Sequence, residues 1–187
     1  MGKIKVEPVE GFEGLCVITP TVFTDCRGDF SEVYSKRDLE EAGLFYDFVQ
    51  ENQIYSRRGA LRGMHYQRCY PQAKLIRVVC GRMFDAVVDI RPDSVSYGKW
   101  YGIELSAENK KQLLIPRGFA HGCLTLSEGS VCTYYCDEFY APGDDGGFMW
   151  NDPAVGIVWP VKTPGNTLQD GSPLILLQKD LSWPPFE

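Results

Sequence analysis

A stretch in the first half of the chain combines strand-like runs with a concentration of reactive side chains. It begins with Ala60-Leu61-Arg62-Gly63-Met64-His65-Tyr66-Gln67, continues through Arg68-Cys69-Tyr70-Pro71, and ends with Gln72–Cys80. Two apolar runs of this length around a short turn-like segment predict a β-hairpin. A symmetric four-residue loop places His65 directly opposite Lys74, with Cβ atoms about 5 Å apart.

A second hairpin is predicted from His121–Leu126 to Val131–Cys136, joined by Ser127-Glu128-Gly129-Ser130. With an even loop Tyr134 lies opposite Cys123, and strand alternation turns His121, Cys123 and Tyr134 to one face. A three-residue loop would reverse this orientation, and Gly129 leaves the loop type open.

The rest of the chain repeats the pattern of short runs rich in Val, Ile, Tyr and Phe between turn residues, and nothing alternates strand with helix. We therefore expect an all-β fold, an antiparallel sandwich or barrel, with about one-tenth to one-fifth of residues in helix. A helix is expected over Arg37–Ala42, ended by Gly43, with one further turn at Ala107–Lys110. The expected strands are Leu15–Ile18, Phe30–Ser35, Phe48–Ile54, Ala60–Tyr66, Lys74–Cys80, Met83–Ile90, Trp100–Leu105, Gln112–Ile115, Gly122–Leu126, Val131–Cys136 and Ile157–Trp159.

The composition limits the domain organisation and the kinds of partner that the protein can have. The 187 residues suit a single domain, and 44% hydrophobic residues are enough for a sizeable core. The net charge is -6 and no run of Lys or Arg exceeds two residues, so a nucleic-acid partner is not expected. No run approaches the ~18 apolar residues of a membrane span, and the first residues show no signal region.

Seven cysteines are spread irregularly, and none forms a Cys-x-x-Cys pair. An odd count without regular spacing argues against both a disulfide framework and a zinc site. Free thiols fit a reducing cytoplasm, which is the expected location.

Only two histidines are present, His65 and His121, and each stands among other reactive residues. The sequence shows no His-x-His pair, no Gly-x-Ser-x-Gly and no Gly-rich phosphate loop, so we expect neither a metal nor another cofactor. What remains is acid–base chemistry by His and Tyr, with Lys to stabilise an oxyanion and Arg to bind phosphate. This set suits removal of a proton next to a carbonyl and its return to the opposite face.

Arg62 and His65 are three residues apart, so a regular strand would place them on opposite faces. If both serve one site, the strand must bulge or bend near Gly63.

Six motifs occur in order along nearly the whole chain. They are Val22–Glu32, Ser56–Gln67, Phe84–Arg91, Leu105–Lys110, Ile115–Gly122, and Trp150-Asn151-Asp152-Pro153 with Trp159-Pro160. In these motifs the sequence resembles the dTDP-4-dehydrorhamnose 3,5-epimerase family. The resemblance implies a cupin-type jelly-roll barrel over residues 1–187, a homodimer with exchanged N-terminal strands, and a nucleotide-diphosphate 4-keto-6-deoxy sugar as substrate.

The resemblance also implies roles for individual residues. His65 is expected as general base, Asp180 as the carboxylate that orients it, Tyr134 as general acid and Lys74 as the stabiliser of the enolate oxygen. Arg62, His121 and Lys179 are expected to contact the sugar and diphosphate, with Gln50 and Asn52 as further polar contacts. Arg27, Phe30 and Glu32 are expected to reach the nucleotide of the neighbouring subunit, and Asp145 stands where the family has Glu.

The sequence departs from the family in places. Lys162–Pro173 is longer than usual, which affects the placement of Lys179 and Asp180, and Tyr135 follows Tyr134 where Lys is common. Alternatives also stay open: a related C3-only or C5-only epimerase, a non-catalytic sugar-binding cupin, or a metal-dependent cupin oxygenase, which two histidines disfavour.

Overall fold

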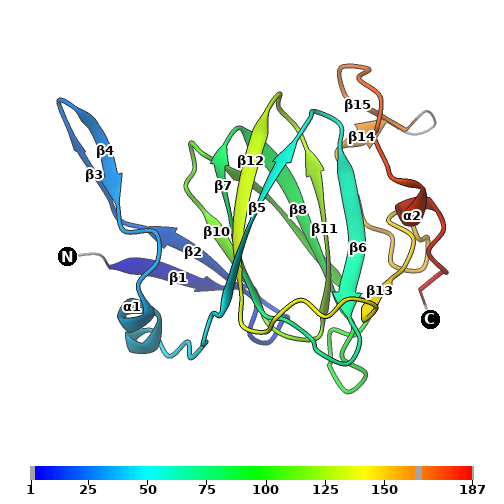
Figure 1. Ribbon diagram of the computed structural model, residues 1–187, viewed down its shortest axis with the longest axis horizontal. Helices are drawn as coiled ribbons and strands as arrows, with labels where there is room; N and C mark the ends of the chain where they lie inside the picture. The colour runs from blue at the N-terminus through cyan, green and yellow to red at the C-terminus, as the bar shows by residue number, and fades with distance from the viewer. Residues whose placement is uncertain (1–2, 163–165, 187) are drawn as a thin grey trace.

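The computed structural model describes residues 3–162 and 166–186, and its core is a pair of antiparallel sheets that face each other (Figure 1). The six-stranded sheet has the order β1 (Ile4–Pro8), β2 (Cys16–Pro20), β10 (Gln112–Ile115), β7 (Lys74–Cys80), β12 (Ser130–Cys136) and β5 (Gln50–Ser56). The five-stranded sheet has the order β13 (Asp145–Gly147), β6 (Leu61–Gln67), β11 (Phe119–Thr125), β8 (Arg82–Asp89) and β9 (Trp100–Ser106). The predicted all-β, jelly-roll class is confirmed.

Alternation along β8 shows how the sheets divide the core. Met83 and Val87 belong to a cluster shared with Ile76 and Cys132 of the opposite sheet, so this cluster fills the interior between the sheets. Phe84 and its alternate neighbours belong to a second cluster on the outer face, covered by the C-terminal segments. A third cluster lies on the outer face of the six-stranded sheet, beneath α1 (Lys36–Glu41) and the residues that follow it.

Helices are scarce, as expected, and the described helices have only six and four residues. Their share is below the one-tenth to one-fifth predicted. The helix α1 is capped by Ser35, whose side chain accepts from the amide of Asp38, and Gly43 follows it with φ of +79°. The second helix, α2 (Gln178–Leu181), was not predicted. Within the described ranges no helix has the length and apolar character needed to cross a membrane.

The strand predictions were right for most of the core. Lys74–Cys80 and Gln112–Ile115 have the predicted bounds, and most other core strands begin and end within three residues of them. Ile157–Trp159 is not a strand; Trp159 is instead buried in the outer cluster, with its indole donating to the carbonyl of Trp150. β1 was missed, and so were four short elements: β3 (Val22–Asp25), β13, β14 (Val161–Lys162) and β15 (Thr167–Leu168).

Both predicted hairpins are wrong. β6 pairs with β11 and β13, whereas β7 pairs with β10 and β12, so His65 lies opposite His121 and Lys74 does not pair with it. β11 and β12 also belong to different sheets. In each case the short connection carries the chain from one sheet to the other, and turn chemistry alone does not distinguish such a crossing from a hairpin.

The single strand face inferred for the second hairpin is wrong as well, because its two strands belong to different sheets. Cys123 lies in the interior cluster and Tyr134 packs against it, although the two residues belong to opposite sheets. They therefore face each other across the interior instead of lying side by side on one face.

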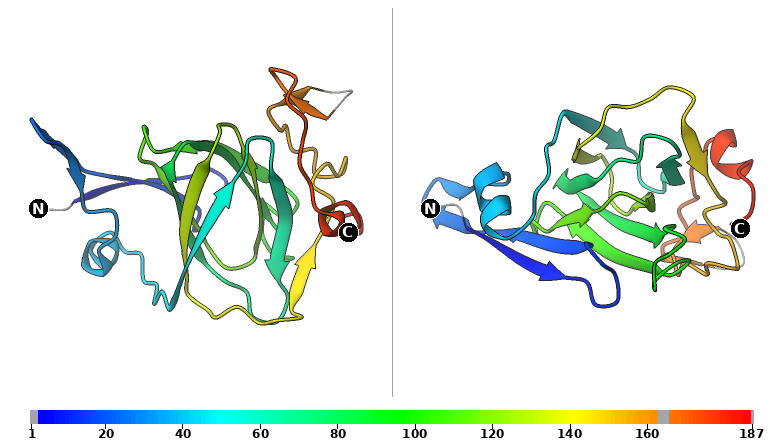
Figure 2. Two further views of the ribbon diagram at one scale, coloured as in Figure 1. Left: turned by 45° about the horizontal axis from the view of Figure 1, so that its top comes forward. Right: turned by 90° about the horizontal axis from the view of Figure 1, so that it is seen from below.

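The hairpin formed by β3 and β4 (Gly28–Ser31) is a separate two-stranded sheet that projects away from the two main sheets (Figures 1 and 2). Phe23 and Phe30 pair across it with ring centroids 6.5 Å apart, and Phe30 is 60% exposed. An isolated two-stranded hairpin is marginally stable in water. Its aromatic pair is exposed on the surface of this chain.

Candidate active site

A bulge in β6 brings Arg62 and His65 to the same face. Arg62 pairs with Cys123 and His65 pairs with His121, so two residues of β6 stand opposite the single residue Gly122. Leu61 and Met64 pack into the outer cluster, which leaves Arg62 and His65 on the interior face. The bulge predicted near Gly63 is confirmed.

Close backbone contact explains the two glycines at the bulge. Gly63 has φ of +130°, and a Cβ there would stand 2.5 Å from Cα of Gly122. A Cβ at Gly122 would stand 2.7 Å from Sδ of Met64 and 2.9 Å from the carbonyl oxygen of Arg62. Only glycine fits both strands at this crossing, so the bulge that aligns Arg62 with His65 depends on this pair.

His65 is held by a buried carboxylate. Nε2 of His65 lies 2.5 Å from Oδ1 of Asp180, whose side chain is 3% exposed. Burial lowers the pKa of His65 below its ordinary value, and the hydrogen bond and charge of Asp180 oppose this by raising it. An imidazole with a lowered pKa is neutral at pH 7 and free to accept a proton. The contact expected between His65 and Asp180 is therefore present.

A second His–Asp pair stands beside the first. Nε2 of His121 lies 3.0 Å from both carboxylate oxygens of Asp85, whose side chain is 2% exposed. No role was predicted for Asp85. The sequence signal that would have found it is strand alternation. Asp85 shares a face of β8 with Met83 and Val87, so its carboxylate points into the apolar interior.

Lys74 and Tyr134 enter the interior from the opposite sheet. Nζ of Lys74 lies 5.8 Å from the ring centroid of Tyr134. Burial is the main cause of two opposite shifts: it lowers the pKa of Lys74 and raises the pKa of Tyr134 to about 12. A phenol with so high a pKa keeps its proton at neutral pH until a strong base receives it.

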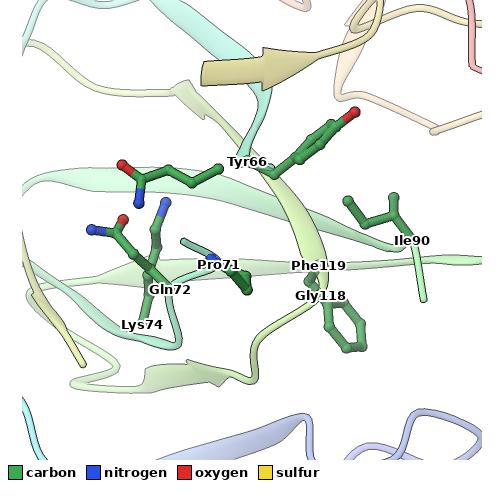
Figure 3. Close-up of a pocket in the computed structure, with 8 residues that line it drawn as sticks. Tyr66, Pro71, Gln72, Lys74, Ile90, Gly118 and Phe119 are labelled. Carbon is green, nitrogen blue, oxygen red and sulfur yellow. The ribbon is translucent and has the colours of Figure 1, made fainter. Parts of the chain in front are cut away.

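Lys74 also borders a small cavity of about 20 Å³ (Figure 3). Lys74 and Gln72 lie next to each other there, and Tyr66 and Ile90 lie on the far side. The cavity is lined by Tyr66, Gln67, Pro71, Gln72, Lys74, Ile90, Gly118 and Phe119.

Gln50 and Asn52 form the polar end of β5. The amide of Gln50 donates to Oδ1 of Asn52, and the amide of Asn52 lies 3.9 Å from the thiol sulfur of Cys136. Oε1 of Gln50 accepts from the backbone N–H of Tyr140. Asn52 also pairs with Tyr134 across the strands, so these amides border the same interior as the candidate acid.

Lys179 and Asp145 form an ion pair close to His65. Nζ of Lys179 lies 2.6 Å from Oδ2 of Asp145, and the hydroxyl of Tyr140 donates to the same oxygen. The hydrogen bond from Lys179 is the main reason that the pKa of Asp145 is lowered. The helix α2 thus supplies two adjacent side chains to the candidate site, with Asp180 directed to His65 and Lys179 to Asp145.

Three predicted site residues are not brought to this interior. Arg27 pairs with Asp25 on the projecting hairpin and its side chain is 86% exposed. Phe30 belongs to the same hairpin, and Glu32 follows it directly. Their positions agree with an outward-directed role, but not with contact to the site of their own chain.

Two further points concern sequence expectations. Across the described parts of the chain, no three His, Cys, Asp or Glu side chains come close enough together to hold a metal ion. The long segment Lys162–Pro173 includes residues 163–165, which lie outside the described residues.

Comparison with known proteins places the chain in a family. The family model described as dTDP-4-dehydrorhamnose 3,5-epimerase matches residues 10–187. The epimerase of that name from Methanothermobacter thermautotrophicus is 44% identical over 174 residues, which cover 93% of this chain and 90% of that protein. The crystal structure of the Elizabethkingia anophelis enzyme superposes with a TM-score of 0.88 at 42% identity, covering 98% of this chain and 96% of that one.

A structure from Legionella pneumophila, a dTDP-6-deoxy-D-glucose-3,5-epimerase in complex with dTDP-4-keto-L-rhamnose, superposes with a TM-score of 0.86 at 34% identity. The superposition covers 98% of this chain and 99% of the Legionella chain. The chain therefore belongs to the dTDP-4-dehydrorhamnose 3,5-epimerase family.

Proposed function

We propose that this protein is a dTDP-4-dehydrorhamnose 3,5-epimerase, an isomerase that converts dTDP-4-dehydro-6-deoxy-D-glucose to dTDP-4-dehydro-L-rhamnose. The observation that carries the proposal is the placement of His65, held by Asp180, on one wall of the interior and of Tyr134 on the opposite wall. Epimerisation removes a proton from one face of a ring carbon and returns one to the other face. A base and an acid on facing sheets meet this need.

The first step is removal of a proton from the carbon next to the 4-keto group. Neutral His65 takes this proton and becomes an imidazolium that Asp180 stabilises. The electron pair of the broken C–H bond forms a double bond to the keto carbon. The product is an enolate with negative charge on the former keto oxygen. The ammonium of Lys74 is the cation assigned to that oxygen.

The second step is protonation of the opposite face. The phenol of Tyr134 gives its proton to the carbon and the enolate returns to the ketone. The phenolate then recovers a proton from solvent, and the imidazolium of His65 releases one to solvent. The pKa of about 12 keeps the phenol protonated beforehand, while a carbanion is basic enough to take its proton. The same pair serves carbons 3 and 5, because both flank the keto carbon.

Cations around the interior suit the diphosphate and sugar. The planar guanidinium of Arg62 can donate two hydrogen bonds to phosphate oxygens. The ammonium of Lys179 adds a positive charge, which forms an ion pair with Asp145 in this structure. His121, Gln50 and Asn52 add hydrogen-bonding groups for the sugar. We assign substrate binding to these residues together with Asp145.

We further propose that residues 1–187 form a single domain that works as a homodimer, with the N-terminal strands exchanged and Arg27, Phe30 and Glu32 placed at the partner's substrate site. The projecting hairpin with its exposed Phe30 supports this arrangement (Figure 2). A reducing cytoplasm is the proposed location, supported by seven cysteines that are all free thiols.

Carbon-resolved deuterium incorporation tests the proposed reaction. The protein is incubated with dTDP-4-dehydro-6-deoxy-D-glucose in D₂O, and the product is analysed by NMR. Deuterium at both carbon 3 and carbon 5, with inverted configuration at each, supports the 3,5-epimerase. Exchange and inversion at one carbon alone would identify a mono-epimerase, and binding without exchange at either carbon would identify a non-catalytic sugar-binding protein.

A further inference from the structure

Trp183, directly after α2, contacts the candidate site without having a role in the mechanism above. Its ring lies edge-on to the imidazole of His65, with centroids 6.1 Å apart. Nζ of Lys179 lies 5.3 Å from the centroid of the same ring. The indole is therefore a neighbour of both the candidate base and a candidate binding cation.

The indole occupies space next to His65 that a side chain of β13 would otherwise fill. Gly147 is the register partner of His65 on the side away from His121. A Cβ built on Gly147 would stand 2.6 Å from Cε2 and 2.7 Å from Cδ2 of Trp183. The absence of a side chain at Gly147 lets the large ring lie flat against the strand, beside the imidazole.

Main-chain hydrogen bonds hold the segment that carries the ring. The amide of Met149 donates to the carbonyl of Pro184, and the amide of Phe186 donates to Oδ2 of Asp152. Phe186 also packs against Phe148, with ring centroids 5.0 Å apart. In the described part of the chain, the buried indole Nε1 of Trp183 has no hydrogen-bond partner. The ring is thus held by packing and by its backbone, not by its own polar group.

We propose that Trp183 is a positioning residue that covers the His65–Asp180 pair and excludes water from the side of the imidazole next to β13. The proposal rests on His65 being the base of the proposed function. It assigns to the indole the task of keeping the imidazole in one orientation and in a setting of low polarity. Trp183 itself is not required to touch the substrate.

The consequence is an effect on the protonation of His65. Of the charged groups around it, Asp180 and Asp145 favour the imidazolium, whereas Lys179 and His121 disfavour it. Burial is the largest influence and lowers the pKa. Removing the indole admits water and leaves these charged groups in the chain, so the pKa of His65 is expected to rise toward its ordinary value of about 6.5.

The test is an NMR titration of the imidazole, which needs neither substrate nor turnover. His121→Gln removes the only other histidine signal and identifies that of His65. Trp183→Ala should raise the pKa of His65 by about one unit, within the range that burial produces. Trp183→Leu, which keeps part of the apolar volume, should raise it by less and serves as the second variant if Trp183→Ala fails to fold.

Phe186→Ala is the matched control, because it loosens the same segment through its contacts with Phe148 and Tyr97 and not through His65. It should lower the melting temperature and leave the pKa of His65 unchanged. An unchanged pKa in both Trp183 variants, or an equal rise in Phe186→Ala, would overturn the proposal. Since the titration measures only the imidazole, such a failure would be distinct from a failure of the epimerase assignment.

Discussion

Nε2 of His65 and Oδ1 of Asp180 lie 2.5 Å apart although 115 positions separate the two residues in the chain. The contact joins β6 of the five-stranded sheet to the short helix near the C-terminus. The proposed base and the proposed orienting group therefore come together only when the C-terminal segment docks on the sheet.

Substitution of Asp180 should change both the rate and its pH dependence. Activity requires neutral His65, so kcat/KM of the wild type should fall only below about pH 6.5, because burial lowers the pKa of His65. Asp180→Asn removes a charge that raises this pKa, so the acid limb should move further down while kcat falls. Steady-state kinetics from pH 4.5 to 8 measure both effects, and an acid limb that moves upward would contradict the assigned interaction.

Tyr134→Phe should separate exchange from inversion. Without the phenol the enolate still forms at His65, so deuterium exchange at the first carbon persists while inversion falls by about 10²–10⁴-fold. Tyr135→Phe is the matched control, because Tyr135 packs on the outer face with Tyr34 and Phe48 and should leave the rate unchanged. Inversion of both carbons at the wild-type rate by Tyr134→Phe would remove Tyr134 from the role of acid.

Gly63→Ala should destabilise the fold and misalign the site. The added Cβ would stand 2.5 Å from the backbone of Gly122, and the positive φ adds strain. We therefore expect the free energy of unfolding, measured in urea, to fall by about 3 kcal/mol or more. Gly143→Ala shares the positive φ but has open space around its Cβ, so it should cost only about 1 kcal/mol. Equal losses for the two variants would show that the close approach to Gly122 is not a constraint.

Arg27 should act on the site of the partner subunit. Arg27→Ala should raise KM for the nucleotide sugar by roughly 10-fold, the effect of losing one charge-assisted contact of about 1.5 kcal/mol. If Arg27 serves the partner, refolded mixtures of Arg27→Ala and His65→Ala chains regain a competent site in each mixed dimer. Mixtures no more active than the separate variants, or a fully active monomer in gel filtration, would contradict the exchanged dimer.

Local features of this fold could be read from the sequence because they depend on neighbouring residues. The runs Lys74–Cys80 and Gln112–Ile115 are apolar and bounded by turns, and they form strands with those bounds. The bulge at Gly63 followed from the spacing of Arg62 and His65, since two residues three apart share a strand face only if the strand is irregular.

Pairing between distant strands was not available from the same signals. The turn at residues 68–73 has the composition of a hairpin loop, yet it carries the chain between sheets, because packing of the interior cluster decides which strands are partners. Asp85 was missed for a related reason. Strand alternation places its carboxylate in the interior, but its contact with His121 joins neighbouring strands across 36 positions of the chain.

Deuterium exchange by His65→Ala tests the central claim, that His65 removes the proton next to the keto group. The variant is incubated with dTDP-4-dehydro-6-deoxy-D-glucose in D₂O beside the wild type and Tyr134→Phe, and deuterium at carbons 3 and 5 is followed by NMR. The account predicts no exchange at either carbon in His65→Ala, although exchange persists in Tyr134→Phe. Exchange at the wild-type rate in a folded His65→Ala variant would show that another group forms the enolate and would contradict the account.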